Sequence, residues 1–126
     1  MNTKERLSQI KKIDKLIELK YAELGKLKDT EATLGNFPHN ESCLNVLDKE
    51  RERTMIQIEQ LLKEKIEISA IIDSISDIEK RLILDMRFLR GLTIKDVAKN
   101  LDYSLRHADR LINAAVDVIK VKNQDG

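Results

Sequence analysis

Apolar residues recur at helical spacing over two long stretches of this chain, and this pattern restricts its fold more than any other feature. In the first 28 residues, Lys20 is the one break in a stripe made of Leu7, Ile10, Ile13, Leu16, Ile17, Leu24 and Leu27. A second stripe extends from about Leu44 to about Asp73. Such spacing is typical of long amphipathic helices, each of which must bury its apolar side against another helix.

Composition favours a fold made of helices alone. Charged residues make up 36% of the 126 residues and aromatic residues only 3%, and no segment alternates apolar and polar residues as a half-buried strand does. We therefore predict an all-α protein. Residues 1–76 would form a long-helix hairpin or coiled coil, interrupted by a loop at 29–43 that contains Gly35 and Pro38.

The two long helices can bury their stripes in two ways. The interruption at 29–43 is long enough for an antiparallel hairpin within one chain, and the stripes can equally pair across a two-fold axis. We expect a homodimer, because the stripe is wider than one hairpin needs and operator DNA is commonly bound by symmetric dimers.

A further helix is predicted from about residue 77 to Arg90, because Ser76 and Glu79 have the spacing of a capping box. The side chains expected to point inward from it are Ile78, Leu82, Ile83, Met86 and Leu89. With two shorter helices that follow, it would form a three-helix domain, residues 77–126.

Residues 89–112 contain two short apolar-periodic stretches separated by about one tight turn. Gly91 can adopt the left-handed conformation that closes the preceding helix. The hydroxyl of Thr93, with Asp96 three residues later, can cap a new helix, which should therefore begin at Ile94.

The turn between these stretches is predicted at Asp102 and Tyr103, and Ser104 would cap the second helix. A left-handed Asp102 costs roughly 1 kcal/mol, which a short polar side chain tolerates. This is the pattern of a helix-turn-helix. The predicted inward side chains are Ile94, Val97, Ala98, Leu101, Ala108, Leu111, Ile112, Ala115 and Ile119.

The pattern resembles region 4 of sigma factors and the related helix-turn-helix regulators. The matching residues are Gly91, Leu92, Thr93, Val97, Ala98, Leu101, Tyr103 and Ser104. The whole chain, from its opening MNTKERLSQIKKIDKLIELK to MRFLRGLTIKDVAKNLDYSLRHADRLINAA, resembles small regulators of phages and prophages of Gram-positive bacteria, including ArpU-type and RinA-type activators of late phage genes. The resemblance implies a sequence-specific transcription regulator, encoded by a phage or prophage and acting in the cytoplasm of a bacterial host.

The resemblance also implies which residues contact double-stranded DNA. The second helix, about 104–120, would lie in the major groove, where Leu105 can touch a thymine methyl, Arg106 can bind guanine O6 and N7, and Asp109 can accept from cytosine N4. The remaining predicted base contacts are His107, Arg110 and Asn113. The predicted contacts to the DNA backbone are Thr93, Lys95, Lys99, Tyr103 and Ser104.

Charge is distributed unevenly, although the net charge is only +1. Residues 1–28 carry eight basic and four acidic side chains, residues 29–80 six and twelve, and residues 81–126 nine and six. DNA contact is therefore expected at the C-terminal domain, with the N-terminal helix as a possible aid. The small positive excess neutralises few phosphates, which favours a dimer or a cooperating partner.

An alternative hypothesis is a protein-interaction module. The exposed face at residues 104–113 bears both signs of charge and would suit a protein surface, such as that of RNA polymerase or another host or phage protein.

Other classes of function lack a sequence signal. There is no phosphate-cradling glycine-rich loop and no nucleophile beside a base, so we expect no enzyme and no cofactor. His39 and Cys43 stand four residues apart without a second pair of ligands, so no metal site is predicted. No apolar stretch approaches the roughly 20 residues of a membrane span, and the single cysteine fits a reducing cytoplasm.

Overall fold

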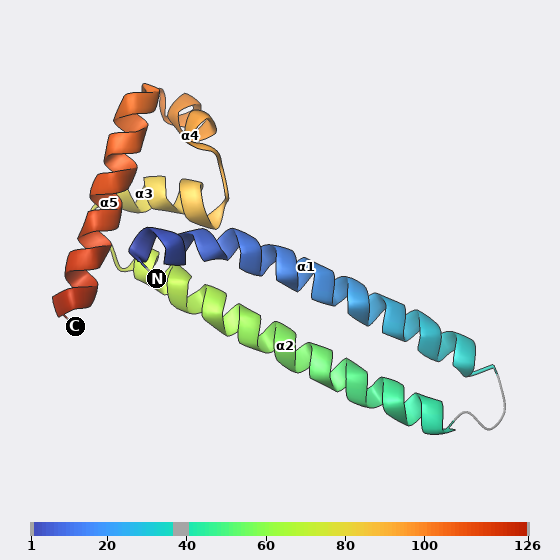
Figure 1. Cartoon of the computed structure of the whole chain (residues 1–126). Coiled ribbons are helices and arrows are strands. Elements are labelled where there is room, and N and C mark those ends of the chain that lie inside the picture. Colours follow the sequence, from blue (N-terminus) through green and yellow to red (C-terminus); the bar gives the residue numbers. More distant parts are fainter. Residues whose placement is uncertain (1, 37–40, 126) are drawn as a thin grey trace. The chain divides into compact units, whose positions relative to one another are not determined.

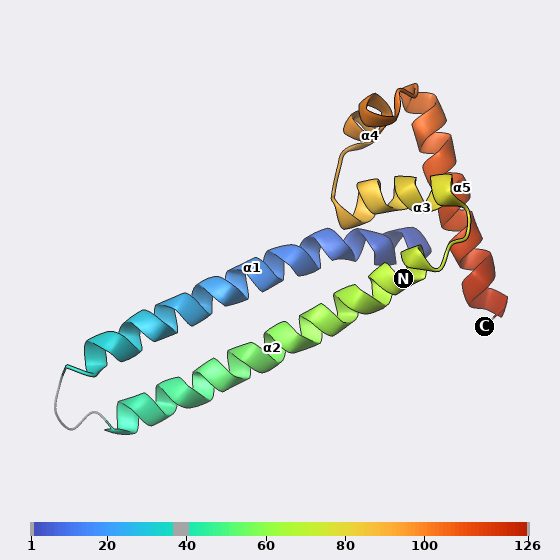
Figure 2. The ribbon, with the colours of Figure 1, turned by 180° about the vertical axis from the view of Figure 1, so that it is seen from behind.

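The computed structural model describes residues 2–36 and 41–125, and every regular element in those ranges is helical (Figures 1 and 2). The elements are α1 (Thr3–Leu34), α2 (Glu41–Asp73), α3 (Ile78–Leu84), the π-helical segment η1 (Asp85–Leu89), α4 (Ile94–Leu101) and α5 (Leu105–Asp125). The predicted all-α class is confirmed for this part of the chain.

The chain is organised as two compact units. The terminal unit comprises Met1–Lys12 and Lys65–Gly126, and the middle unit comprises Ile13–Glu64. These units divide the chain inside both long helices, whereas the sequence suggested one division at residue 76. The start of α1 therefore belongs to the same unit as α3, α4 and α5, and its side chains Leu7 and Ile10 are only 1% and 0% exposed.

In the middle unit, α1 and α2 lie side by side and run in opposite directions in both views (Figures 1 and 2). The partly buried apolar side chains are three, seven or fourteen residues apart along each helix, namely Ile17, Leu24, Leu27, Leu34, Leu44, Leu47 and Leu61. Among the described residues of this unit, only Ile13, Thr54 and Ile58 are buried. Two helices thus cover each other's apolar stripes incompletely, as expected where no further layer is present.

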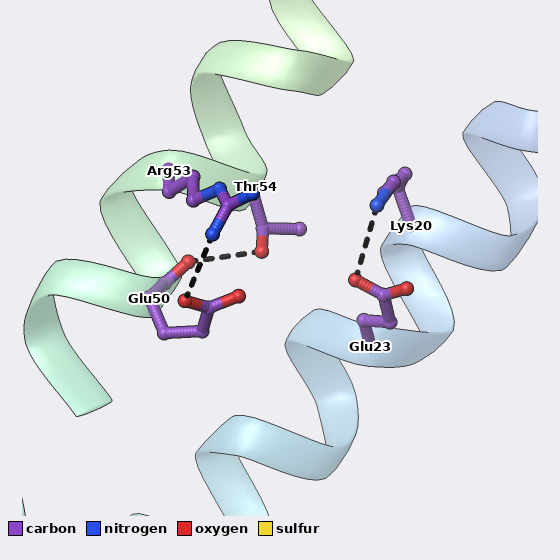
Figure 3. Close-up of polar contacts among 5 residues, drawn as sticks. All are labelled: Lys20, Glu23, Glu50, Arg53 and Thr54. Atoms are coloured by element: carbon purple, nitrogen blue, oxygen red, sulfur yellow. Dashed lines mark hydrogen bonds and ion pairs between the residues drawn. The ribbon is translucent and has the colours of Figure 1, made fainter. Parts of the chain in front are cut away.

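Polar side chains interrupt the apolar stripe where α1 faces α2 (Figure 3). Lys20, the predicted break, is partly buried, and its Nζ lies 3.5 Å from the carboxylate of Glu23. On α2, the hydroxyl of the buried Thr54 donates to the carbonyl oxygen of Glu50 at 2.9 Å. Lys20 and Thr54 thus find their partners on their own helices, so neither polar group is left unsatisfied.

An ion pair between Arg51 and Glu31 connects the two helices of the middle unit. A guanidinium nitrogen of Arg51 lies 3.2 Å from a carboxylate oxygen of Glu31, and the same guanidinium also pairs with Asp48 on its own helix. Because the side chains of Arg51 and Glu31 are 40% and 37% exposed, solvent screens the pair, which contributes about 0–1 kcal/mol. It helps to define which turns of the helices face each other.

The loop predicted at 29–43 is wrong at both ends, because α1 continues through residue 34 and α2 begins at Glu41. The hydroxyls of Thr30 and Thr33, in this last part of α1, donate to carbonyl oxygens one turn earlier in the helix, both at 3.0 Å. The helix ends before Gly35. Part of the predicted loop, residues 37–40, lies outside the described residues.

The third helix begins one residue later than predicted. The side chain of Asp77, and not that of Ser76, accepts a hydrogen bond from the backbone N–H of Lys80 at 3.0 Å. Since a carboxylate is at least as good a helix cap as a hydroxyl, Asp77 takes the capping position. The helix α2 ends at Asp73 as predicted, and residues 74–77 separate it from α3.

The buried face of α3 and η1 also differs from the prediction. Ile83 and Leu84 are both 0% exposed, so the inward direction of α3 lies between them. At 100° per residue, Leu82 and Ile78 lie about 150° and about 170° from that direction, on the opposite side of the helix, and they are 44% and 72% exposed. The predicted Met86 is buried. Phe88 is buried where the stripe predicted Leu89, because a π-helical turn holds more residues than an α-helical one and shifts the periodicity.

The end of η1 is closed by a glycine, as predicted. The backbone N–H of Arg90 donates to the carbonyl of Asp85 at 2.9 Å, and that of Leu92 donates to the carbonyl of Met86 at 3.0 Å. Gly91 between them has φ of +70°, a left-handed conformation that a residue without Cβ adopts at no steric cost. The chain can therefore turn sharply from η1 towards α4.

Candidate nucleic-acid interface

The two predicted caps position the helices of the candidate site. The Thr93 hydroxyl accepts from the backbone N–H of Asp96, and the Ser104 hydroxyl accepts from that of His107, both at 3.1 Å. In consequence α4 and α5 each begin at the residue after the cap. Both hydroxyls satisfy N–H groups that have no partner within the helix.

The turn between α4 and α5 depends on Asp102, which has φ of 59° and ψ of 40°. The predicted left-handed conformation is confirmed. The backbone N–H of Tyr103 then donates to the carbonyl of Ala98 at 2.8 Å, which ends α4 and leads directly into α5.

We expect Asp102→Gly to raise the free energy of unfolding by about 0.5–1 kcal/mol, because glycine adopts this conformation without the steric cost of a Cβ. Asp102→Val should lower it by about 1–2 kcal/mol, since a β-branched residue is strained there. Urea unfolding followed by circular dichroism measures both. Equal stability of the two variants would contradict the assigned conformation.

Beneath the turn, the inner sides of α4 and α5 carry the predicted core. Ala98 is 4% exposed and Ala108 is 0% exposed, so two small side chains lie where the helices meet. Of the other predicted core residues, Val97, Ile112, Ala115 and Ile119 are buried, and Ile94, Leu101 and Leu111 are partly buried. Val116 is a buried residue that the predicted stripe left out. The core fixes which side of α5 faces outward.

The outward side of α5 brings four predicted base-contacting residues together. Arg106, Asp109, Arg110 and Asn113 line a shallow depression of about 510 Å³, together with Ala114 and Asp117. Leu105, at the start of the helix, is 56% exposed. We call the exposed charged and amide residues Arg106, Asp109, Arg110, Asn113 and Asp117 the α5 strip. Its two arginines and two aspartates give it no net charge.

Tyr103 and His107 form a separate cluster beside the turn. The Tyr103 hydroxyl donates to a carboxylate oxygen of Glu79 at 2.6 Å, and its ring meets that of His107 edge-on, with centroids 4.4 Å apart. The hydrogen bond to the Glu79 carboxylate, together with desolvation, raises the pKa of Tyr103 above its ordinary value of 10.0. The phenol therefore stays protonated at neutral pH and connects the turn to α3.

The predicted contacts to the DNA backbone lie on α4 and at the two caps. Lys95 and Lys99 are exposed, so their ammonium groups are available to an external anion. The hydroxyls of Thr93 and Ser104 face solvent in part but already accept backbone hydrogen bonds as caps.

One neighbour of the α5 strip was missed from the sequence. Nζ of Lys4, at the start of α1, lies 3.5 Å from Oδ1 of Asn113 on the α5 strip, across 109 positions of sequence. The amide nitrogen of Asn113 in turn lies 3.5 Å from a carboxylate oxygen of Asp109. The only signal for this contact was the excess of basic residues in the first 28 positions, and it did not specify a residue.

Other kinds of site find no support in the described ranges. Residues 2–36 and 41–125 contain no group of three His, Cys, Asp or Glu side chains placed to hold a metal ion, and His39 lies outside them. No helix in these ranges is both long and apolar enough to pass through a membrane. Comparisons of this chain with protein-family models, curated proteins and solved structures find no match.

Proposed function

We propose that this chain is a sequence-specific DNA-binding regulator of phage or prophage genes in the bacterial cytoplasm, with α4, the turn and α5 as a helix-turn-helix. The main support is the geometry from Thr93 to Asn113. Two capped helices are joined by a three-residue turn, 102–104, with one left-handed residue, and the second helix presents an exposed polar face. That is the arrangement in which a second helix enters the major groove.

The exposed side chains of α5 fit the edges of DNA bases. Arg106 can bind both acceptors of a guanine, Asp109 can accept from a cytosine amino group, and Leu105 can contact a thymine methyl. Arg110 and Asn113 extend this set along the helix, while Lys95 and Lys99, one turn apart on α4, would contact phosphates. Tyr103 would contact the backbone from the turn, and the neighbouring His107 would contact a base edge.

We further propose that the chain acts as a homodimer assembled through the middle unit. The apolar side chains Leu16, Leu19, Tyr21, Val46, Met55, Ile56 and Leu62 are between 38% and 66% exposed. Two adjoining grooves, of about 660 and 630 Å³, share Arg51 and Met55 as lining residues. A second copy would cover part of this apolar surface and give the complex two α5 strips. Two strips would contact more phosphates than one, which compensates for the small positive charge of each copy.

We expect the purified chain to retard a duplex fragment from the DNA flanking its own gene in a mobility-shift assay, more strongly at about 50 mM than at about 200 mM salt. Each phosphate contact releases counterions, so affinity must fall steeply with salt. Failure to shift any flanking fragment at low salt would count against the proposal.

A second candidate function is binding to RNA polymerase or another protein. The observation that favours it is the zero net charge of the α5 strip beside the exposed Leu105. In that case, the chain would form a complex with the polymerase while showing no salt-sensitive affinity for DNA.

A further inference from the structure

The first turns of α1 are part of the unit that contains the α5 strip. Leu7 and Ile10 are buried, and Lys4 reaches Asn113, so this end of α1 is held at a defined place beside α5 (Figures 1 and 2). It is not a free tail. A side chain on it has a fixed relation to the candidate recognition helix.

Two lysines share the side of α1 that reaches α5. Lys4 and Lys11 are seven residues apart, which places them within about 20° of each other around the helix and about 10.5 Å apart along it. Both are exposed, as is Ser8 between them. Ser8 donates its hydroxyl to the carbonyl of Lys4 at 2.8 Å, so the lysines carry the charge of this side.

These lysines change the charge of the surface next to the α5 strip. The strip alone is neutral, because Asp109 and Asp117 offset Arg106 and Arg110. Adding Lys4 and Lys11 gives an excess of two positive charges along one edge. An ammonium group has three donors, so Lys4 can keep its contact with Asn113 and still donate to another oxygen.

We infer that Lys4 and Lys11 form a second phosphate-binding element, which holds the backbone of duplex DNA beside the groove entered by α5. The inference rests on the proposed DNA binding. Their separation of about 10.5 Å corresponds to about three base-pair rises of duplex, so the two lysines contact different phosphates. The N-terminal turns supply the positive charge that α5 lacks, without sequence preference.

The test measures the salt dependence of binding by the full chain to a short mixed-sequence DNA duplex, followed by fluorescence anisotropy. Lys4→Ala/Lys11→Ala should reduce the ratio of affinities at about 50 and 200 mM salt roughly tenfold, because each lost contact removes about 0.9 from the slope. Lys4→Arg/Lys11→Arg should keep the wild-type slope. Lys26→Ala is the control. Lys26 is exposed and lies about 33 Å from Lys4 along α1, so its replacement should change the salt slope little.

Three outcomes separate the hypotheses. If the wild type binds with a steep salt dependence and the double alanine variant, with an unchanged unfolding transition, has the same slope, the inference is wrong and the proposed function stands. If Lys26→Ala reduced the salt slope as much as the double alanine variant does, the effect would come from total charge, and the inference would also be wrong. If the wild type shows no salt-sensitive binding, the proposed function is wrong, and the inference, which rests on it, is wrong as well.

Discussion

Replacing Ile10 by alanine should lower the free energy of unfolding of the terminal unit by about 2–5 kcal/mol, the usual cost of deleting a fully buried aliphatic side chain. Ile10 is 0% exposed, although it lies near the start of a 32-residue helix that continues into the middle unit. If the first turns of α1 only paired two long helices, the same substitution would leave α3, α4 and α5 untouched.

Tyrosine fluorescence can show that the stability lost in Ile10→Ala is lost in the terminal unit. The chain has two tyrosines and no tryptophan, so in a Tyr21→Phe background Tyr103 is the sole strong emitter. Tyr103 contacts His107 and Glu79, both in the terminal unit. The urea midpoint of its signal should fall in Ile10→Ala.

The control on the same helix is Lys26→Ala, because Lys26 lies on α1 but is exposed and outside the apolar surface proposed for the dimer. We expect a change within about 0.5 kcal/mol for this variant. An effect of Ile10→Ala no larger than that of Lys26→Ala would show that the start of α1 does not belong to the unit that carries the candidate site.

Features encoded by neighbouring residues were predictable from the sequence. The caps at Thr93 and Ser104 and the left-handed residues Gly91 and Asp102 were placed correctly, because each depends on one side chain and the backbone within a few positions. The inward stripe of α5 also followed from periodicity, since an uninterrupted α-helix keeps 3.6 residues per turn.

Features that depend on competition or on distant contacts were not predictable. Ser76 and Asp77 are both good caps, and the sequence alone could not decide between them. The π-helical turn of η1 buries Phe88 in place of the predicted Leu89, and no residue type predicts such a turn. The contact between Lys4 and Asn113 joins the two ends of the chain, and any of several basic residues near the N-terminus fitted the charge pattern equally well.

Replacing Arg106 by alanine should weaken binding to the specific operator by about 1–3 kcal/mol, or roughly 5- to 150-fold, and relax the preference for one base pair. The guanidinium is exposed on the α5 strip, next to Asp109 and Arg110. Competition binding with operator variants, changed at one position at a time, measures both effects. Lys99→Ala should weaken binding to every DNA sequence by a similar factor, because a phosphate contact carries no sequence information.

Arg106→Lys distinguishes base recognition from simple charge. Lysine keeps the positive charge but lacks the planar guanidinium fork that fits guanine O6 and N7, so the variant should keep the salt slope and weaken the base preference. Arg53→Ala, on the middle unit, is the arginine control, since its side chain is 71% exposed. If Arg106→Lys retained full discrimination, Arg106 would act on the phosphates, and sequence recognition would have to come from Asp109, Arg110 or Asn113.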